Sequence, residues 1–268
     1  MLLWCGLAGC DAAPPVTQAP SASQAPSVTQ ASSVAQAPSP PAGLPSVDVG
    51  PEAVDAVVEY TGGAQAVDKV PVVVAIHGLG DRPDAFRGLF QGFPGRARFV
   101  FPAGGLPRGG GFAWWPISGK IDENSMAPGL YAASERLAKA LSKWSSGAAG
   151  KPVVTGFSQG GMLSYTLAAR HPEALSEAVP ISGLVPPKLV PSAWPAGAPR
   201  PRIFGLHGEA DERVPFAYAK SGADRLRALG LEVDFRSYPG VGHTISADMR
   251  RDLFEALSAA VDRASKAP

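Results

Sequence analysis

Ser158 stands in the motif Gly156-Phe157-Ser158-Gln159-Gly160, between an apolar run at 152–155 and an apolar stretch with helical spacing. A serine hydroxyl is a weak nucleophile and reacts only when a neighbouring base removes its proton. On a tight turn between a strand and a helix, flanking glycines let the two elements approach closely. The helix N-terminus behind the serine favours developing negative charge. The pattern therefore predicts Ser158 as the nucleophile of an acyl-transfer reaction.

Such a serine needs a general base, and the chain has four histidines. His77 belongs to a glycine-rich turn, His171 ends a predicted helix, and His207 directly follows a predicted strand. His243 stands in Val241-Gly242-His243-Thr244, on a loop between the last predicted strand and the final helix. Functional side chains gather at this end of the strands in folds with parallel sheets, so His243 is the predicted base.

A carboxylate that accepts a hydrogen bond from an imidazole fixes its tautomer and stabilises the imidazolium. Asp211 lies between the serine and the histidine along the chain, in a loop after a predicted strand and before Val214-Pro215. Glu209 and Glu212 are its neighbours and remain alternatives. Asp211 is the predicted orienting acid.

The turn His77-Gly78-Leu79-Gly80-Asp81 follows the first long predicted strand. Glycines in such a turn let a backbone N–H point toward the carboxyl ends of the strands. Together with the N–H of Gln159, this backbone N–H would hold the negative oxygen of a tetrahedral intermediate. An ordinary glycine turn is the simpler interpretation, but the position one strand–helix unit before Ser158 favours an oxyanion hole.

All these residues follow apolar runs that alternate with stretches of helical spacing. Val70–Ile76 predicts a strand buried on both faces, and Val54–Tyr60 predicts an antiparallel edge strand. The other predicted strands are 98–102, 152–155, 178–182, 202–206 and 233–238, and the predicted helices are 83–92, 127–145, 160–170, 216–229 and 246–264. This alternation predicts an α/β fold with a doubly wound, mostly parallel sheet.

The hydrophobic content, net charge and cysteine count of the chain limit the classes of function that it can have. The 268 residues are 45% hydrophobic, enough for one sizeable core. A formal net charge of +1 gives no reason to expect nucleic acid as a partner. The two cysteines, Cys5 and Cys10, both stand at the N-terminus, so the folded part has no disulfide or thiolate metal site. No cofactor or metal is predicted, and no oligomeric state is indicated.

The first 45 residues differ from the rest. Leu7-Ala8-Gly9-Cys10 resembles the lipobox of bacterial lipoproteins, in which a signal peptide, here 1–9, is removed and the cysteine is lipidated. The stretch before it is short and has no Lys or Arg, so a chance hydrophobic N-terminus is the alternative. Residues 10–45, rich in Ala, Pro, Ser and Gln, predict a disordered tether ahead of a globular domain at 46–268. The expected location is the bacterial cell envelope, with a lipid anchor as the only membrane contact.

Four motifs together resemble the carboxylesterase/phospholipase family of α/β-hydrolases, which includes acyl-protein thioesterases. They are the turn at 77–81, the serine motif at 156–161, His207-Gly208 with Asp211 and Val214-Pro215, and Gly242-His243. The resemblance implies an α/β-hydrolase fold without a large cap domain and metal-free hydrolysis of carboxylic esters or thioesters. It implies Ser158, Asp211 and His243 as the catalytic triad, and the N–H groups of Leu79 and Gln159 as the oxyanion hole.

The resemblance is weaker around the substrate. Phe112-Ala113-Trp114-Trp115-Pro116 resembles an aromatic stretch beside the family's acyl pocket, which implies Trp114 and Trp115 as substrate-binding residues; core packing is the alternative. The Gly-rich stretch 104–111, interpreted as a flexible rim, and the Pro-rich stretch 185–201 depart from the family where pocket walls are expected. The expected substrate is a small-molecule or lipid ester of unspecified chain length.

Functions other than that of a serine esterase are compatible with parts of the sequence. A lysophospholipase or an acyl thioesterase would use the same triad. A non-catalytic, lipid-anchored binding protein on this scaffold is expected to lack a triad residue, and here all three positions are filled. A structural envelope lipoprotein would need residues 1–45 to carry the function.

Overall fold

The strand β2 (Val72–Ile76) lies inside the fold and alternates its side chains between two hydrophobic layers. A computed structural model describes residues 41, 43–117 and 122–267. In it, Val72, Val74 and Ile76 pack in one layer and Val73 and Ala75 in the other. All five side chains are buried, which confirms the predicted strand with two buried faces.

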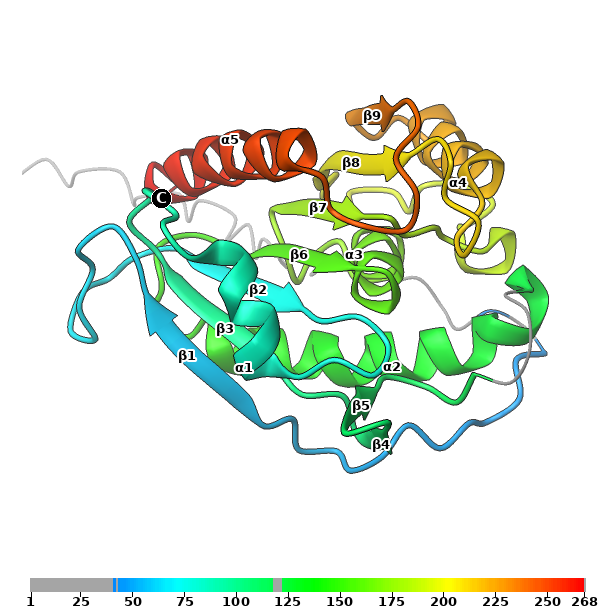
Figure 1. Cartoon of the computed structure of the whole chain (residues 1–268), viewed down its shortest axis with the longest axis horizontal. Helices are drawn as coiled ribbons and strands as arrows, with labels where there is room; N and C mark the ends of the chain where they lie inside the picture. Colours follow the sequence, from blue (N-terminus) through cyan, green and yellow to red (C-terminus); the bar gives the residue numbers. More distant parts are fainter. Residues whose placement is uncertain (1–40, 42, 118–121, 268) are drawn as a thin grey trace, which may run out of the picture. The chain divides into compact units, whose positions relative to one another are not determined.

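Seven strands form the main sheet in the order β1-β3-β2-β6-β7-β8-β9 (Figure 1). Besides β2 they are β1 (Ala56–Tyr60), β3 (Arg98–Pro102), β6 (Val153–Phe157), β7 (Glu177–Ile181), β8 (Arg202–Gly208) and β9 (Val233–Tyr238). All neighbours are parallel except β1, which runs antiparallel to β3 at the edge. The doubly wound, mostly parallel sheet and its antiparallel edge strand are as predicted.

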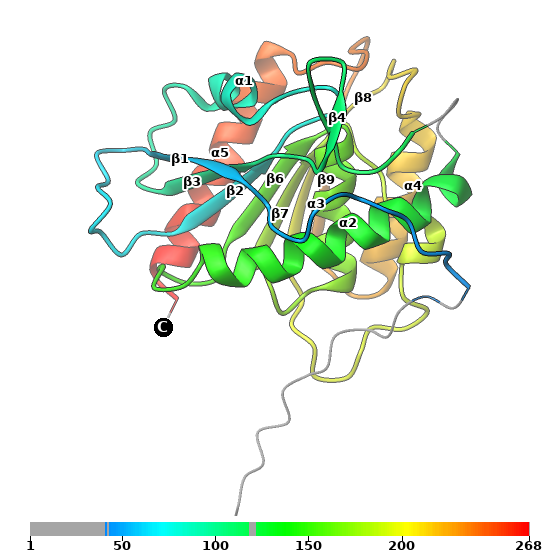
Figure 2. The same ribbon diagram turned by 90° about the horizontal axis from the view of Figure 1, so that it is seen from below.

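Helices cover both faces of this sheet (Figure 2). One face carries α1 (Pro83–Phe86), the 3₁₀ turn η1 (Arg87–Phe90) and α5 (Ala247–Ser265). The other carries α2 (Glu123–Trp144), α3 (Gln159–Arg170), α4 (Phe216–Ala228) and the short 3₁₀ turn η2 (Pro187–Leu189). The single helix predicted for 83–92 is therefore one α-helical turn followed by a 3₁₀ turn.

Helix α2 begins four residues before the predicted start at Ala127. The carboxylate of Asp122 caps it by accepting a hydrogen bond from the Ser125 N–H (2.8 Å). Pro128 lies inside the helix, where a proline normally disfavours helix continuation. The apolar spacing on which the predicted start rests begins at Ala127, whereas the cap that starts the helix lies further upstream.

The Gly-rich stretch expected as a flexible rim forms a hairpin of β4 (Leu106–Arg108) and β5 (Gly111–Ala113). Its turn residues Gly109 and Gly110 have φ values of 57° and 84°. Two successive positive φ angles suit a tight hairpin turn, and glycine adopts them without steric cost. The rim interpretation is therefore wrong.

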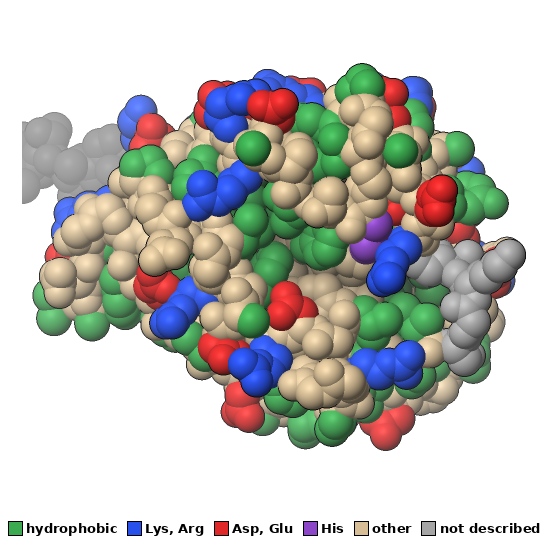
Figure 3. All heavy atoms as spheres, viewed as in Figure 1, with side chains coloured by type: hydrophobic (Ala, Val, Ile, Leu, Met, Phe, Trp, Pro, Cys, Tyr) green, Lys and Arg blue, Asp and Glu red, His purple; other side chains and the backbone are tan. Residues whose placement is uncertain are grey.

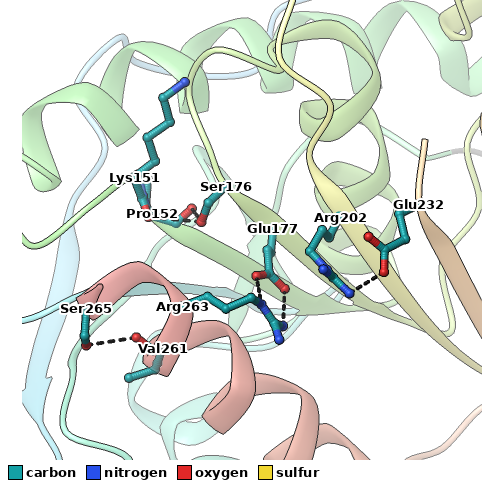
Figure 4. A network of polar contacts seen from close by, with 9 residues as sticks. All are labelled: Lys151, Pro152, Ser176, Glu177, Arg202, Glu232, Val261, Arg263 and Ser265. Carbon is teal, nitrogen blue, oxygen red and sulfur yellow. Dashed lines mark hydrogen bonds and ion pairs between the residues drawn. The ribbon is translucent and has the colours of Figure 1, made fainter. Parts of the chain in front are cut away.

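A polar network holds α5 at the amino ends of the strands (Figure 4). Arg263 donates from Nε to Glu177 Oε1 (2.6 Å) and from Nη2 to Glu177 Oε2 (2.8 Å). Glu177 opens β7, and Arg202, which opens β8, pairs with Glu232. These contacts lie at the opposite end of the strands from Ser158.

The predicted signal peptide, Cys10 and most of the predicted tether lie outside the described residues, so the boundary at residue 46 stays a prediction. Leu44 and Val47 already pack against the hydrophobic core, and Arg136 of α2 donates to the carbonyls of Val49 (2.6 Å) and Pro51 (3.0 Å). Within residues 41–267, as far as they are described, no helix combines the length and apolar character needed to cross a membrane.

Candidate active site

Ser158 occupies the turn between β6 and α3, with φ 56° and ψ −113°. Residues other than glycine seldom adopt a positive φ. A Cβ atom at Gly160 would lie 1.9 Å from the carbonyl oxygen of Ile76, and one at Gly156 would lie 2.6 Å from the same oxygen. Both flanking positions therefore require glycine, and the strained strand–turn–helix geometry predicted from the motif is confirmed.

Ser158, His243 and Asp211 form a hydrogen-bonded chain. Ser158 Oγ lies 2.9 Å from His243 Nε2, and His243 Nδ1 lies 2.8 Å from Asp211 Oδ2. One tautomer satisfies both contacts: Nδ1–H donates to the carboxylate, and Nε2 accepts from the hydroxyl. The imidazole also packs against the ring of Phe157, with centroids 4.8 Å apart. The structure thus brings together three predicted site residues from three distant segments.

The carboxylate of Asp211 is fixed from both sides. Its Oδ1 accepts hydrogen bonds from the N–H groups of Arg213 (3.0 Å) and Val214 (2.8 Å), which leaves Oδ2 for His243. Burial alone would raise the pKa of Asp211, but hydrogen bonds from His243 and the Val214 N–H, with the nearby histidine charges, hold that pKa below its ordinary value. The acid is therefore ionised at neutral pH and oriented toward the imidazole.

The two alternative acids lie elsewhere. Glu209 accepts a hydrogen bond from Ser237 Oγ (2.7 Å), and Glu212 lies on the lining of the cavity over Ser158. Within the described part of the chain, Asp211 is the carboxylate that contacts the His243 imidazole.

Leu79 and Gln159 line the same cavity as Ser158. Neither backbone N–H donates to a carbonyl group among the described residues, so both can bind an oxygen of a substrate. The β4–β5 hairpin holds the turn that carries Leu79. The Gly80 N–H donates to the Phe112 carbonyl (2.8 Å), and the Phe112 N–H donates to the Asp81 carbonyl (3.0 Å).

Trp114 and Trp115 are core residues, 0% and 1% exposed, and neither lines the cavity. The expectation that they contact substrate is therefore wrong, and the alternative of core packing describes them. Trp114 nevertheless supports the site, because its N–H donates to Gln159 Oε1 (3.0 Å) and its Nε1–H donates to the His77 carbonyl (3.0 Å). It joins the two segments that carry Leu79 and Gln159.

His77 also supports this region. Its Nε2 accepts from the Gly104 N–H (3.1 Å), and its Nδ1 lies 2.7 Å from the Gly78 carbonyl oxygen, to which it donates. Burial lowers the pKa of His77, while the hydrogen bond with Gly78 and the charge of Asp81 oppose that shift. A neutral imidazole is the state that makes both hydrogen bonds.

The cavity over Ser158 has a volume of about 760 Å³. Ile117, Met162 and Pro215 give it an apolar lining, and Glu212 and Arg213 add charge. On the face shown in Figure 3, hydrophobic side chains gather in a hollow with a histidine and charged side chains around it.

Sequence reasoning missed this lining. Met162 follows Ser158 by one helical turn, a spacing that could have indicated it, whereas Ile117 carries no such signal. The two stretches expected as pocket walls, 104–111 and 185–201, supply none of the described lining residues. Val185 and Leu189, from the second stretch, pack in the core instead. Across the described residues, no three His, Cys, Asp or Glu side chains are grouped to hold a metal ion.

A doubly wound, mostly parallel sheet with a linked serine, histidine and aspartate at the carboxyl ends of its strands defines an α/β-hydrolase. Solved structures share this fold. Esterase PE8 matches with a TM-score of 0.66 and 24% identity, over 77% of this chain and 99% of that one. The carboxylesterase of Bacillus cereus matches with a TM-score of 0.64 and 19% identity, over 79% of this chain and 94% of that one. At these identities the likeness shows the fold alone.

The phospholipase/carboxylesterase family model matches residues 63–261, and the chain belongs to this family. Carboxylesterase SOBER1 of Arabidopsis thaliana is 33% identical over 94 residues, which are 35% of this chain and 41% of that protein. Acyl-protein thioesterase 1 of Debaryomyces hansenii is 33% identical over 106 residues, which are 39% of this chain and 46% of that protein. The chain thus spans less than half the length of these curated relatives.

Proposed function

We propose that this protein is a serine hydrolase that cleaves carboxylic esters through an acyl-enzyme. The observation that carries the proposal is the hydrogen-bonded chain from Ser158 through His243 to Asp211, on a strained turn beside an open cavity. Membership in the phospholipase/carboxylesterase family supports the same reaction class. A complete chain of three side chains favours catalysis over a purely binding role.

In the first step, Ser158 Oγ attacks the ester carbonyl carbon while His243 Nε2 takes the hydroxyl proton. The carbonyl oxygen becomes an oxyanion, which accepts hydrogen bonds from the N–H groups of Leu79 and Gln159. The positive charge on His243 is balanced by Asp211, which stays ionised. The bond to the alcohol oxygen then breaks, and His243 Nε2 gives its proton to that oxygen.

In the second step, water replaces the departed alcohol. His243 Nε2 takes a proton from this water as its oxygen attacks the acyl carbon, and the same two N–H groups hold the second oxyanion. The bond to Ser158 Oγ breaks, the serine regains its proton from His243, and the carboxylic acid leaves. No atom other than those of ester, water and protein is needed.

The test uses the full chain with p-nitrophenyl esters from C2 to C16 and a fluorophosphonate probe, which labels only an activated serine. We expect Ser158→Ala to lose at least about 10⁴-fold in kcat and all labelling. Ser182→Ala is the matched control, because Ser182 is a buried serine that also has a positive φ, 46°, and its hydroxyl has no hydrogen-bond partner among the described residues. Labelling that survives in Ser158→Ala, with an unchanged unfolding curve, would overturn the assignment.

Thioesters are a second substrate class for the same site. One relative raises it by name, acyl-protein thioesterase 1 of Debaryomyces hansenii. Lysophospholipase-like protein 1 of Mus musculus, 32% identical over 97 residues, instead names a lipid oxygen ester as the alternative. Matched oxygen and sulfur esters of one acyl group separate the two activities. A higher kcat/KM for the oxygen ester supports the esterase, and the reverse ranking supports the thioesterase.

We also propose that Cys10 anchors the protein to a membrane of the bacterial cell envelope. The support is the sequence Leu7-Ala8-Gly9-Cys10 and the Pro- and Ala-rich stretch that follows it. Full-length protein is expected in the membrane fraction and to take up a labelled fatty acid, whereas Cys10→Ser is expected in the soluble fraction without label. Equal partitioning of the two proteins would contradict the anchor.

A further inference from the structure

A second hollow, of about 340 Å³, opens beside His243. It shares Asp81, Phe157 and His243 with the larger cavity. Its remaining lining comes from α1, from η1 and from the loop before α5, namely Ala85, Phe86, Leu89, Thr244 and Ile245. We call this hollow the α1 groove. The two hollows therefore meet at the imidazole that moves the proton in the proposed reaction.

The walls of the α1 groove are held in place by the protein itself. Arg250 of α5 donates from Nε to the Leu89 carbonyl (2.9 Å) and from Nη2 to the Gln91 carbonyl (2.6 Å). Leu89 and Ile245 are half-buried and pack against the hydrophobic cluster on that face of the sheet. The groove is thus formed before any ligand binds, mostly by apolar side chains with Asp81, His243 and Thr244 among them, which lowers the cost of ordering it.

The chemistry of ester cleavage assigns the two hollows to the two parts of a substrate. The carbonyl oxygen must reach the N–H groups of Leu79 and Gln159, which line only the larger cavity. The leaving oxygen must reach His243 Nε2, which protonates it. The α1 groove begins at His243 and lacks both oxyanion residues and Ser158, so it lies where the alcohol part would extend. The larger cavity is left for the acyl part.

One carboxylate lines the α1 groove, and the nearby positive charge is that of Arg250, whose guanidinium is bonded to the Leu89 carbonyl. Asp81 is the groove's only Asp, Glu, Lys or Arg lining residue within the described chain. Its Oδ1 accepts from the Arg82 N–H (2.8 Å), while the Arg82 guanidinium pairs with Asp84 (3.1 Å) instead. A negative charge at the junction of the two hollows repels an anionic substituent on the alcohol. The remaining lining favours carbon chains.

We propose that the α1 groove binds the alcohol part of the ester and selects uncharged, apolar alcohols over alcohols that carry an anionic group. This inference rests on the proposed ester hydrolysis and adds a substrate class to it.

Two ester series test the inference on the full chain. In one, acetates of ethanol to hexanol vary the alcohol; in the other, ethyl esters of acetic to hexanoic acid vary the acyl part. Wild-type kcat/KM is expected to rise in the alcohol series by up to about fourfold for each methylene that is buried. Leu89→Ser should flatten this rise and leave the acyl series unchanged, and Ile117→Ser in the larger cavity should do the reverse.

Two further variants refine the test. Leu89→Trp fills the groove and covers the underlying core, so it should reduce turnover of hexyl acetate and leave turnover of ethyl acetate unchanged. This variant keeps the test valid if Leu89→Ser folds poorly. Asp81→Asn should raise kcat/KM several-fold for 4-acetoxybutyrate, whose alcohol part is anionic, relative to butyl acetate, and added salt should shrink that difference.

A Leu89→Ser variant that flattens the acyl series, or that leaves both series unchanged, would overturn the inference. An Asp81→Asn variant with an unchanged ratio for the anionic ester would overturn the charge selection. Failure of the proposed function looks different: no ester in either series would be hydrolysed, and the fluorophosphonate probe would not label wild-type Ser158.

Discussion

The Nε2 atom of His207 lies 3.5 Å from Oδ2 of Asp211, so a second histidine stands directly against the carboxylate of the proposed triad. The same Nε2 donates to the carbonyl of Val214 (2.8 Å), whose N–H donates to Asp211 Oδ1 (2.8 Å). Burial lowers the pKa of His207, while backbone hydrogen bonds with Val214 and Gly183 and the charge of Asp211 oppose the shift. His207 thus holds Val214, whose N–H in turn orients the carboxylate of Asp211.

We predict that His207→Leu lowers kcat/KM by about tenfold or more and destabilises the fold by about 1–3 kcal/mol, because the buried Val214 carbonyl loses its donor. His207→Gln should recover most of both losses, since its side-chain amide can donate to the same carbonyl. The measurements are urea unfolding and kcat/KM from pH 5 to 9. Equal activity of His207→Leu and wild type would show that the loop keeps Asp211 in place without this histidine.

Asp211→Asn should lower kcat by about 10³- to 10⁴-fold with little change in KM, because an amide in place of the carboxylate favours the wrong tautomer of His243. Glu209→Gln is the matched control, since Glu209 contacts Ser237 and not the imidazole. Initial rates with one p-nitrophenyl ester are sufficient. A larger loss in Glu209→Gln than in Asp211→Asn would reassign the acid.

The sequence predicted the features that local patterns encode. Ser158 is framed by glycines that its turn requires, and the β-branched residues of β2 indicate a strand with two buried faces. Glycine pairs also indicate tight hairpins, so the turn at Gly109-Gly110 could have been predicted from the same rules.

The cavity lining could not be predicted in this way, because it depends on segments that meet only in the folded chain. An aromatic stretch gives no indication of which side faces the core, so it predicts substrate contacts for Trp114 and Trp115 as readily as the core packing that the structure has. Ile117 and Leu89 reach their hollows through loops and a 3₁₀ turn that have no periodic pattern. The role of His77 likewise depends on a non-local contact, because its neutral imidazole accepts a hydrogen bond from the N–H of Gly104.

Removal of the Arg263 side chain should destabilise the protein without affecting catalysis. Arg263→Ala leaves the carboxylate of Glu177, whose side chain is 9% exposed, without its two-point partner. We expect a loss of about 2 kcal/mol in the free energy of unfolding, less than for a fully buried pair because the arginine is 45% exposed. The activity per folded molecule should be unchanged, since the pair lies at the opposite end of the strands from Ser158.

Arg251→Ala, on the same helix, is the comparison for Arg263→Ala. Arg251 pairs with Asp248, and the two side chains are 60% and 68% exposed. Arg251 also lies 3.5 Å from Asp252, but that carboxylate keeps Arg236 as a partner when Arg251 is removed. Surface pairs of this kind contribute about 0–1 kcal/mol. Equal losses in the two variants, measured by urea unfolding, would show that the burial of Glu177 adds nothing to the stability of the Arg263 contact.

His171 is expected to make the stability of the fold depend on pH. It ends α3, with Nε2 3.3 Å from Glu135 Oε1 and Nδ1 4.0 Å from Glu173 Oε1, and Arg170 stands beside it. Burial lowers the pKa of His171 from 6.5 to about 4, with the charge of Glu135 opposing and that of Arg170 adding to the shift. Between these values the unfolded chain binds a proton that the native protein does not.

The stabilisation from a neutral His171 is therefore fully present above about pH 6.5 and is lost as the pH falls toward 4. From pH 7.5 to pH 5 the loss should be about 2 kcal/mol. His171→Gln removes this titration. As the pH falls from 7.5 to 5, the free energy of unfolding should therefore decrease by about 2 kcal/mol less in the variant than in wild type. His77 and His207, which shift in the same direction, are present in both proteins and cancel in the difference. A difference that stays constant with pH would mean that the native protein accommodates a protonated His171, with Glu135 and Glu173 as its partners.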